Sequence, residues 1–252
     1  MNAEEQLRKS KLTKKDHRYL VIKQLPSNFR SYDTDTVYVR GLTWGEVSSL
    51  STIASNATYT DLANIYSDAI DGVEVEELEL MDFIILMEIS TIWTSRKNGW
   101  VPNVRCPHVI YNEDNGNPSR CNGVITDPIV LSDLKINESE ITESFIPTGI
   151  IHNNKEVIVS PIKVKNMISI ENNSNKYDNE TALSYAEMIT NPEMTLDEKY
   201  NFVLYGEAEE IQILEKIDEE LDVDVDLINK KCPSCGSNVK IKISLNELKA
   251  YP

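Results

Sequence analysis

The sequence predicts an α+β fold, and three features lead to that prediction. The segment from Leu78 to Gly99 is apolar on nearly all sides when drawn as a helix, which is typical of a helix inside a core. Short segments such as Val37–Arg40 alternate apolar and polar residues, as half-buried strands do. Four cysteines occur as two pairs far apart in the chain, and a strand-like segment follows each pair. Helices and short strands are therefore expected to build different parts of the chain.

Residues 31–104 are expected to form a strand and helical region. Thr43 and Glu46 have the spacing of a capping box, in which each side chain caps a backbone N–H of the other residue, so a helix is expected from Trp44. A second helix is expected over residues 58–70, because their apolar side chains recur on one helical face. The long apolar helix then completes this N-terminal part.

Residues 137–228 are expected to form an inserted region of strands and helices. The clearest strand signal lies in KEVIVSPIKVKNMISI, residues 155–170. Two or three helical segments follow a polar linker, and the last of them, from Ala208, is amphipathic with an acidic outer face. The alternating acids of residues 222–226 lack the glycine and the distal glutamate of a calcium loop, so no calcium site is expected.

The chain is strongly acidic. It has 252 residues, with 41 Asp and Glu against 25 Lys and Arg and a formal net charge of −16. Such a surface repels phosphate backbones and acidic membranes, so neither nucleic acid nor membrane is expected as a partner. The sequence has no pattern of a signal peptide or a membrane span, and we therefore expect a reducing cytosol, where four cysteines favour a metal over disulfides.

Residues 1–30 are expected to form a basic N-terminal arm. The basic residues that distinguish it from the acidic remainder are Arg8, Lys9, Lys11, Lys14, Lys15 and Arg18. Two interpretations are open: a solvated tail, or an arm that docks on an acidic neighbour such as a second copy of the chain.

The cysteine pairs belong to a degenerate repeat. When Cys121 is aligned with Cys235, the segment Leu131–Lys135 coincides with Leu245–Lys249, and a strand-like segment precedes both. Each half thus supplies two thiolates and a strand leading away from them. Two such halves that face each other close a tetrahedral site, which is the arrangement of a zinc ribbon.

The sequence therefore predicts a split zinc ribbon, built from residues 105–136 together with 229–252. Its predicted zinc ligands are Cys106, Cys121, Cys232 and Cys235. The turn-rich residues between Cys106 and Cys121 are interpreted as a hairpin that extends from the first cysteine pair. His108 is the alternative ligand, because it lies two residues after Cys106. Cys121 is preferred, because the repeat places it opposite Cys235.

The long insertion between the halves is compatible with a single site. Closing a loop of 110 residues costs about 4 kcal/mol in its length-dependent part. A structural zinc ion contributes roughly 10–16 kcal/mol of binding free energy. The free energy of zinc binding is therefore larger than the cost of closing the loop.

No enzymatic activity and no small-molecule substrate are expected. Four thiolates leave a zinc ion without an open position at which to activate water. The sequence has only three histidines and nine glycines, without a phosphate-binding loop, a nucleophile elbow or a His-Glu-x-x-His motif.

A family resemblance appears in the order of these motifs. The segment VYVRGLTWGEVSSLS, a helical pair, the Leu-x-x-x-Asp-Phe pattern of Leu78 to Phe83, Ile-x-x-x-Trp and an Arg-Cys-Pro knuckle follow one another. This order resembles the T-even-type bacteriophage baseplate hub and hub-assembly family, best over residues 35–110 and the C-terminal knuckle. The first cysteine pair departs from the compact Cys-x-x-Cys of that family.

The resemblance implies a structural or assembly role in a contractile-tail baseplate. Partners would be other hub or wedge proteins, with possible self-association, and the location would be the virion baseplate or the host cytoplasm during assembly. The alternative is a zinc-ribbon module of the nucleic-acid-binding or transcription-accessory class, which would present basic residues such as Lys240 and Lys242 on its strands.

Overall fold

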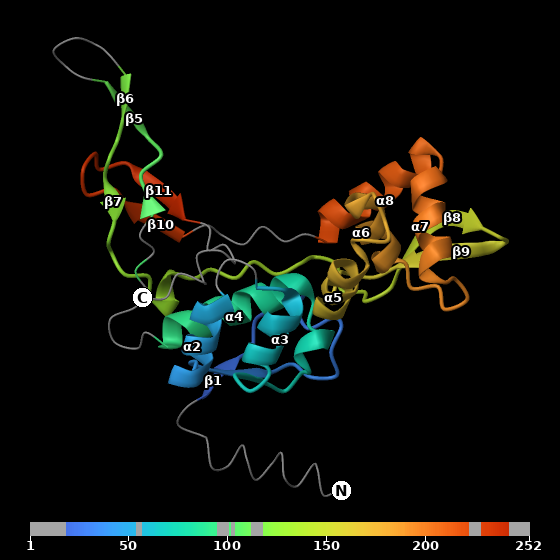
Figure 1. Ribbon diagram of the computed structural model, residues 1–252, viewed down its shortest axis with the longest axis horizontal. Coiled ribbons are helices and arrows are strands. Elements are labelled where there is room, and N and C mark those ends of the chain that lie inside the picture. Colours follow the sequence, from blue (N-terminus) through green and yellow to red (C-terminus); the bar gives the residue numbers. More distant parts are fainter. Residues whose placement is uncertain are drawn as a thin grey trace, which may run out of the picture.

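The described residues form helices and several small antiparallel sheets, which confirms the predicted α+β fold. The structure is a computed structural model that describes residues 19–53, 57–94, 101, 104–111, 118–221 and 228–241. Figure 1 shows the ribbon strands at one end of the long axis, the N-terminal part in the middle and the inserted region at the other end. Among the described residues, no helix combines the length and apolar character needed to cross a membrane.

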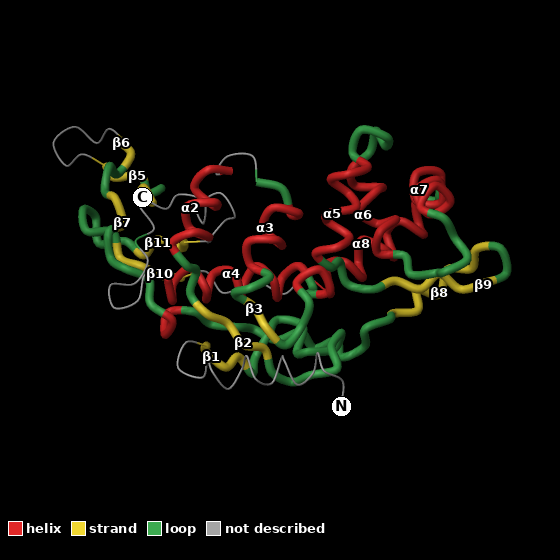
Figure 2. The backbone as a smooth tube through the Cα atoms, turned by 60° about the horizontal axis from the view of Figure 1, so that its bottom comes forward, coloured by secondary structure: helices red, strands yellow, loops and turns green. Residues whose placement is uncertain are grey.

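The N-terminal part is a layer of helices over an antiparallel sheet, as Figure 2 shows from a second direction. Its strands are β1 (Tyr19–Ile22), β2 (Val37–Arg40) and β3 (Ile70–Asp71), with β2 in the centre. Its helical elements are α2 (Trp44–Ile53), α3 (Tyr59–Tyr66), the short 3-10 helix η1 (Val75–Glu77) and α4 (Leu80–Thr94). Val37 and Val39 are buried, and the residues that alternate with them are partly exposed, as the period-two pattern predicts.

Side-chain caps define where the first two helices begin. The Oε2 atom of Glu46 accepts a hydrogen bond from the backbone N–H of Thr43 at 2.6 Å, and Thr43 Oγ1 accepts one from Glu46 N at 3.4 Å. Thr58 and Asp61 form the same reciprocal pair before α3. Both pairs satisfy N–H groups that the first helical turn leaves without a partner.

Helix α4 is buried on almost every side, as its apolar composition predicts. Ile85 and Ile89 lie one turn apart and are both in the core. Two of its polar residues bond to the backbone of the segment around β2. The buried Ser90 donates from Oγ to the carbonyl of Arg40 at 2.7 Å, and the half-buried Thr94 accepts at Oγ1 from the N–H of Leu42 at 2.6 Å. These bonds attach β2 and the following turn to the C-terminal part of the helix.

The prediction that residues 1–30 form an arm is wrong for residues 19–30. Strand β1 pairs with β2, and Leu25 and Ser27 are fully enclosed. The carboxylate of Asp82, near the start of α4, accepts hydrogen bonds from the backbone N–H of Ser27 at 2.9 Å and from the hydroxyl of Tyr32 at 2.6 Å. Residues 19–30 therefore belong to the folded N-terminal part, and residues 1–18 lie outside the described residues.

The inserted region has a core of its own. It contains the hairpin β8 (Ile146–His152) and β9 (Lys155–Val159), followed by α5 (Val164–Asn173), α6 (Glu180–Met188), α7 (Leu196–Tyr205) and α8 (Ala208–Leu221). Most of its buried side chains form a second cluster, separate from the cluster around α4, to which Val164 belongs. The hairpin turns at two asparagines with positive φ, 49° and 62°, which is the backbone of a type I′ turn.

The strand signal over residues 155–170 is correct only in its first part. Strand β9 ends at Val159, Pro161 follows, and the chain enters α5 at Val164. The side chain of Asn166 caps that helix by accepting the backbone N–H of Lys163 at 2.9 Å. Proline and a capping asparagine thus override the β-branched composition of the segment.

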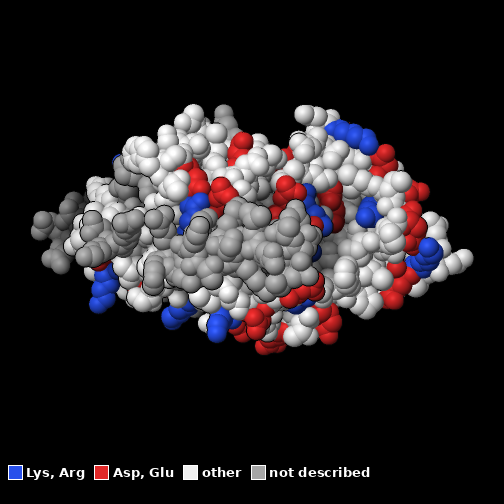
Figure 3. All heavy atoms as spheres, turned by 90° about the horizontal axis from the view of Figure 1, so that it is seen from below, with Lys and Arg blue, Asp and Glu red and all other residues white. Residues whose placement is uncertain are grey.

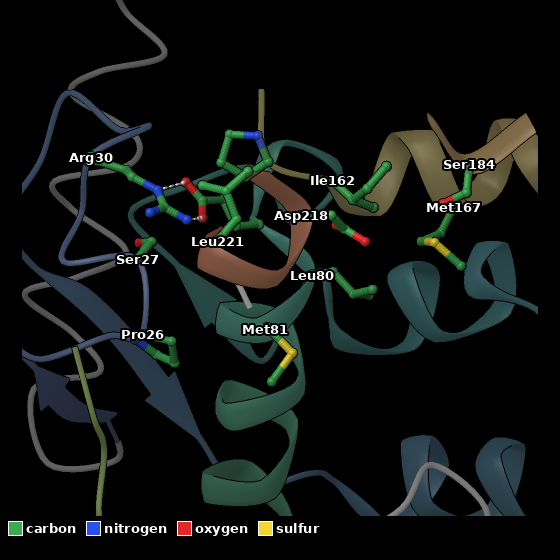
Figure 4. Close-up of a pocket in the computed structure, with 12 residues that line it drawn as sticks. Pro26, Ser27, Arg30, Leu80, Met81, Ile162, Met167, Ser184, Asp218 and Leu221 are labelled. Carbon is green, nitrogen blue, oxygen red and sulfur yellow. Dashed lines mark hydrogen bonds and ion pairs between the residues drawn. The ribbon is translucent and has the colours of Figure 1, made fainter. Parts of the chain in front are cut away.

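A buried ion pair of the N-terminal part lies at the junction with the inserted region. Arg30 donates from Nε and Nη2 to the two carboxylate oxygens of Glu79, at 3.0 and 2.7 Å, and both side chains are at most 5% exposed (Figure 4). The same guanidinium donates to Ser139 Oγ and to the carbonyl of Ile141, which lead into the inserted region. Backbone bonds between Leu80 and Ile162 continue the junction.

We expect the junction to be sensitive to the loss of either charge. Changing Glu79 to Gln leaves the buried guanidinium of Arg30 without a counter-charge, which should destabilise the protein by about 3–5 kcal/mol in urea unfolding. Glu193→Gln is the matched control, because Glu193 pairs with Lys155 on the exposed surface. That variant should unfold almost as the wild type does. Equal stabilities of the two variants would contradict a structural role for the Arg30–Glu79 pair.

Candidate metal centre

The ribbon consists of two equivalent two-stranded sheets with cysteines at the ends of their strands. The sheets are β4 (Val104–Arg105) with β7 (Val124–Ile125), and β10 (Ile228–Lys231) with β11 (Asn238–Ile241). Cys106 and Cys232 directly follow the first strand of each sheet. Cys121 and Cys235 each stand three residues before the second strand. The offset of the sequence repeat is thus also the offset of these strands.

The backbone repeats the same equivalence. The N–H of Cys106 donates to the carbonyl of Gly123 at 2.8 Å, and the N–H of Cys232 donates to the carbonyl of Ser237 at 2.9 Å. Gly123 and Ser237 both lie two residues after the second cysteine of their pair. In each half, the same backbone hydrogen bond therefore closes the loop that carries the two cysteines.

The sulfurs of Cys106, Cys121, Cys232 and Cys235 converge on one point. All four Sγ atoms lie within 4.8 Å of one another. The Cys106–Cys235 and Cys121–Cys232 sulfur pairs are each 3.7 Å apart, and both contacts cross from one half of the ribbon to the other. Three of the cysteines are buried, and Cys235 is half-buried.

This spacing fits a tetrahedral metal ion. Metal–sulfur bonds of about 2.3 Å, as for zinc, place the sulfurs of a tetrahedron about 3.8 Å apart. A disulfide requires sulfurs about 2.05 Å apart, and all four cysteines are free. The cluster therefore has the donor atoms and the spacing to hold a metal ion with four thiolates.

The thiols differ in how readily they ionise. Burial raises the pKa of the Cys106 thiol to about 12, whereas hydrogen bonds with Ser237 lower the pKa of the Cys235 thiol to about 6. Four negative charges this close repel one another in a poorly hydrated site. A divalent cation relieves that repulsion, because it stabilises each thiolate directly.

The hairpin predicted between Cys106 and Cys121 is present. It pairs β5 (Val109–Tyr111) with β6 (Pro118–Arg120), and Figure 1 shows it projecting away from the rest of the chain. The N–H of Cys121 bonds to the carbonyl of His108 at 2.8 Å, which closes the base of the hairpin. The fourteen intervening residues therefore return the chain to the site.

His108, the alternative ligand, lies beside the sulfur cluster. Its Nδ1 atom is 3.3 Å from the sulfur of Cys106, whereas the atoms that all fall within 4.8 Å of one another are the four cysteine sulfurs. When Cys106 is a thiolate, only the histidine can donate the hydrogen in this contact. The arrangement suits an imidazole that orients a ligand from outside the coordination sphere.

Gly123 is a residue of the site that the sequence pattern did not identify. A Cβ atom at this position would lie 2.5 Å from the sulfur of Cys232 and 2.8 Å from Ser234 Oγ. The two halves approach so closely that only glycine leaves room for the ligand sulfur. The signal in the sequence was a single glycine two residues after Cys121, which carries no metal-site pattern by itself.

A salt bridge also links the two halves of the ribbon. Lys230, in β10, donates to Asp133 Oδ2 at 2.8 Å and to the carbonyl of Pro128 at 2.9 Å. Asp133 ends the 3-10 helix η3 (Leu131–Asp133), which occupies the repeat segment after β7. Its counterpart at residues 245–249 lies outside the described residues.

Two cavities adjoin Arg30, away from the sulfur cluster. The one in Figure 4, of about 390 Å³, lies between the N-terminal part and the inserted region. The other, of about 480 Å³, is more polar and includes Lys163, Lys165 and Lys199. Neither cavity is lined by a histidine or a cysteine from the described part of the chain. They therefore contribute no residue to the metal centre.

The ligand set predicts a specific pattern of metal content. The wild type should bind one zinc ion per chain, and Cys121→Ser or Cys232→Ser should lose it, because three sulfurs no longer close the tetrahedron. His108→Ala should keep one ion per chain with affinity about 10- to 100-fold weaker. Elemental analysis with a competing chelator measures both quantities. Loss of the ion from His108→Ala together with its retention in Cys121→Ser would contradict this ligand set.

The close contact at Gly123 predicts a second effect on the metal. Gly123→Ala should weaken zinc binding, because the added methyl group displaces the sulfur of Cys232. Gly45→Ala is the control: its Cβ would meet only Thr43 Oγ1, at 4.0 Å, on helix α2. The control should retain wild-type zinc affinity. Equal affinities in both variants would show that the site accommodates the methyl group.

Comparison with protein-family models, with curated proteins and with solved structures found no match to this chain.

Proposed function

We propose that this protein is a structural or assembly component of the hub region of a contractile-tail phage baseplate. A structural zinc ion held by Cys106, Cys121, Cys232 and Cys235 stabilises it. The observation that carries the proposal is the convergence of four sulfurs at tetrahedral spacing. An ion with four thiolate ligands has no open position for water, so it supports the fold rather than a reaction. The assignment to a baseplate rests on the resemblance of residues 35–110 and the C-terminal knuckle.

The projecting hairpin supports a role in protein contacts. Every side chain described in β5 and β6 is exposed, including the apolar Val109 and Ile110 at 52% and 42%. A two-stranded hairpin is marginally stable alone in water. This one is tied to the metal centre at its base and presents apolar side chains to the solvent, which suits contact with another hub or wedge protein.

A specific observation also favours the alternative, a nucleic-acid-binding ribbon. The exposed residues of the ribbon include Arg105, Arg120, Lys231 and Lys240. Lys231 and Lys240 lie on the same face of the β10–β11 sheet, because Lys231 pairs with Asn238 and Lys240 pairs with Asn229. Basic strands of this kind bind phosphate backbones in zinc-ribbon modules. The acidic remainder of the chain opposes such binding, so we favour the assembly role.

The assembly role predicts a defect when the hairpin is altered. Val109→Glu should leave the metal content unchanged and reduce incorporation of the protein into baseplate intermediates, because it places a charge in an apolar contact. Ile151→Glu is the control, since Ile151 is an exposed residue of the hairpin in the inserted region. Mass spectrometry of purified tails and their precursors measures incorporation. Contractile tails that form normally without the protein would contradict the proposal.

Duplex DNA separates the two candidates. The assembly role predicts no retention of the metal-loaded protein on DNA at low salt. Tight retention that weakens steeply as salt rises, and that Lys231→Glu abolishes, would assign the ribbon to nucleic acid instead.

A further inference from the structure

The net charge of the protein conceals two parts of opposite sign. The ribbon, residues 104–136 with 228–252, holds eight Lys and Arg against five Asp and Glu, an excess of three positive charges. Four thiolates with a divalent cation would remove only two of these. The inserted region, residues 137–221, holds six Lys and Arg against eighteen Asp and Glu, an excess of twelve negative charges.

The positive part presents a surface that is both basic and apolar. Lys231 and Lys240 occupy the outer face of the β10–β11 sheet, whose inner face is buried. Arg120 pairs with Val109 in the β5–β6 hairpin, so a guanidinium lies beside an exposed apolar side chain. We call the exposed residues Arg105, Val109, Arg120, Lys231 and Lys240 the basic ribbon surface, whereas Ile110 pairs with Ser119 on the other face of the hairpin.

The inserted region presents a surface that is both acidic and apolar. The exposed acids of α8 include Glu209, Glu215, Glu219 and Glu220, and Ile213 lies one helical turn after Glu209 with 38% of its surface exposed. The neighbouring Tyr205, at the end of α7, is 79% exposed. We call these six residues the acidic α8 surface, among which the exposed Lys216 pairs with Glu220 at 3.5 Å. Figure 3 shows that Asp and Glu are spread over the half of the molecule that carries the inserted region.

The two surfaces cannot meet within one molecule of this structure. Figure 1 places the ribbon strands at one end of the long axis and helices α6 to α8 toward the other, with the N-terminal part between them. Complementary surfaces at opposite ends favour contact between different molecules. Such a contact is heterologous: in a pair, one copy keeps a free acidic surface and the other keeps a free basic surface, so further copies can add.

We propose that the protein associates head to tail, with the basic ribbon surface of one copy on the acidic α8 surface of the next. Opposite charges steer and orient the contact, and the exposed apolar residues of both surfaces are removed from water within it. A repeated contact of this kind forms a closed ring or an open filament, according to the rotation between neighbours. Phosphate backbones are the less favourable partner, because the inserted region of the same chain would repel them.

Sedimentation velocity on the full-length, zinc-loaded protein tests the contact. Association should increase with protein concentration at low salt and disappear near 1 M salt, where the screening length is about 3 Å. A wild type that stays monomeric at every concentration at low salt overturns the proposal. The baseplate role does not depend on this contact, because the formation of contractile tails without the protein tests that role separately.

Charge reversal identifies the two surfaces. The ribbon variant Arg120→Glu/Lys240→Glu and the helix variant Glu215→Lys/Glu219→Lys should each lose association. An equimolar mixture of the two should regain it, because each reversed surface then meets a reversed partner. Lys23→Glu/Lys155→Glu changes the net charge as much as the ribbon variant does, at exposed positions outside both surfaces, and should associate like the wild type.

Metal content and cooperative unfolding, measured on every variant, show that the reversed side chains leave the fold intact. Association that persists in either variant, or a mixture that stays monomeric, overturns the assignment of the surfaces. Retention of the wild type on duplex DNA, lost in the ribbon variant, would assign the basic surface to nucleic acid and also overturns it.

Discussion

The convergence of four cysteine sulfurs is the constraint on which the ribbon depends. Its sheets are two-stranded, and β4 and β7 are only two residues long, so neither could persist alone in water. The cluster joins them across 110 residues of chain, whose closure costs about 4 kcal/mol in its length-dependent part. A tetrahedral ion supplies several times that amount. The close approach at Gly123 follows from the same constraint, because both halves must reach one ion.

The ribbon extends the N-terminal core rather than forming an isolated module. Cys106, Cys121 and Cys232 belong to the same buried cluster as the residues of α4, together with Ile125 and Val239. The candidate metal site therefore shares its buried cluster with α4, the most apolar helix described. This arrangement explains how a small, strand-poor ribbon can present a projecting hairpin: its base lies at the sulfur cluster, which packs against the core.

The inserted region is joined to the N-terminal part by polar contacts and by two apolar side chains of α5, because Val164 and Ile168 pack in the cluster around α4. Its core is separate from that of α4, and the junction is formed by the Arg30–Glu79 pair and by backbone bonds between residues 78–80 and 162–164. Burying an ion pair requires removing both charges from water, and the bidentate geometry with two further acceptors offsets that cost. A junction of this kind has strict geometry, so it sets the orientation of the acidic region relative to the basic ribbon.

The sequence by itself determined where several helices begin and which four sulfurs could meet. Capping residues such as Thr43 and Glu46 specify helix starts through local hydrogen bonds, and the apolar composition of α4 requires burial on all sides. The repeat around Cys121 and Cys235 identified which sulfurs could meet, because equivalent halves carry their ligands at equivalent positions. All of these signals are local in the chain or repeat within it.

Only the tertiary structure decided which residues support those elements. The ion pair of Arg30 with Glu79 spans 49 positions, and in the sequence Arg30 was indistinguishable from the basic residues of a solvated arm. The contact of His108 with Cys106, the need for glycine at position 123 and the separation of charge into two ends all depend on distances between segments far apart in the chain. Sequence patterns report periodicity and spacing, whereas these features arise from where the folded chain brings unrelated segments together.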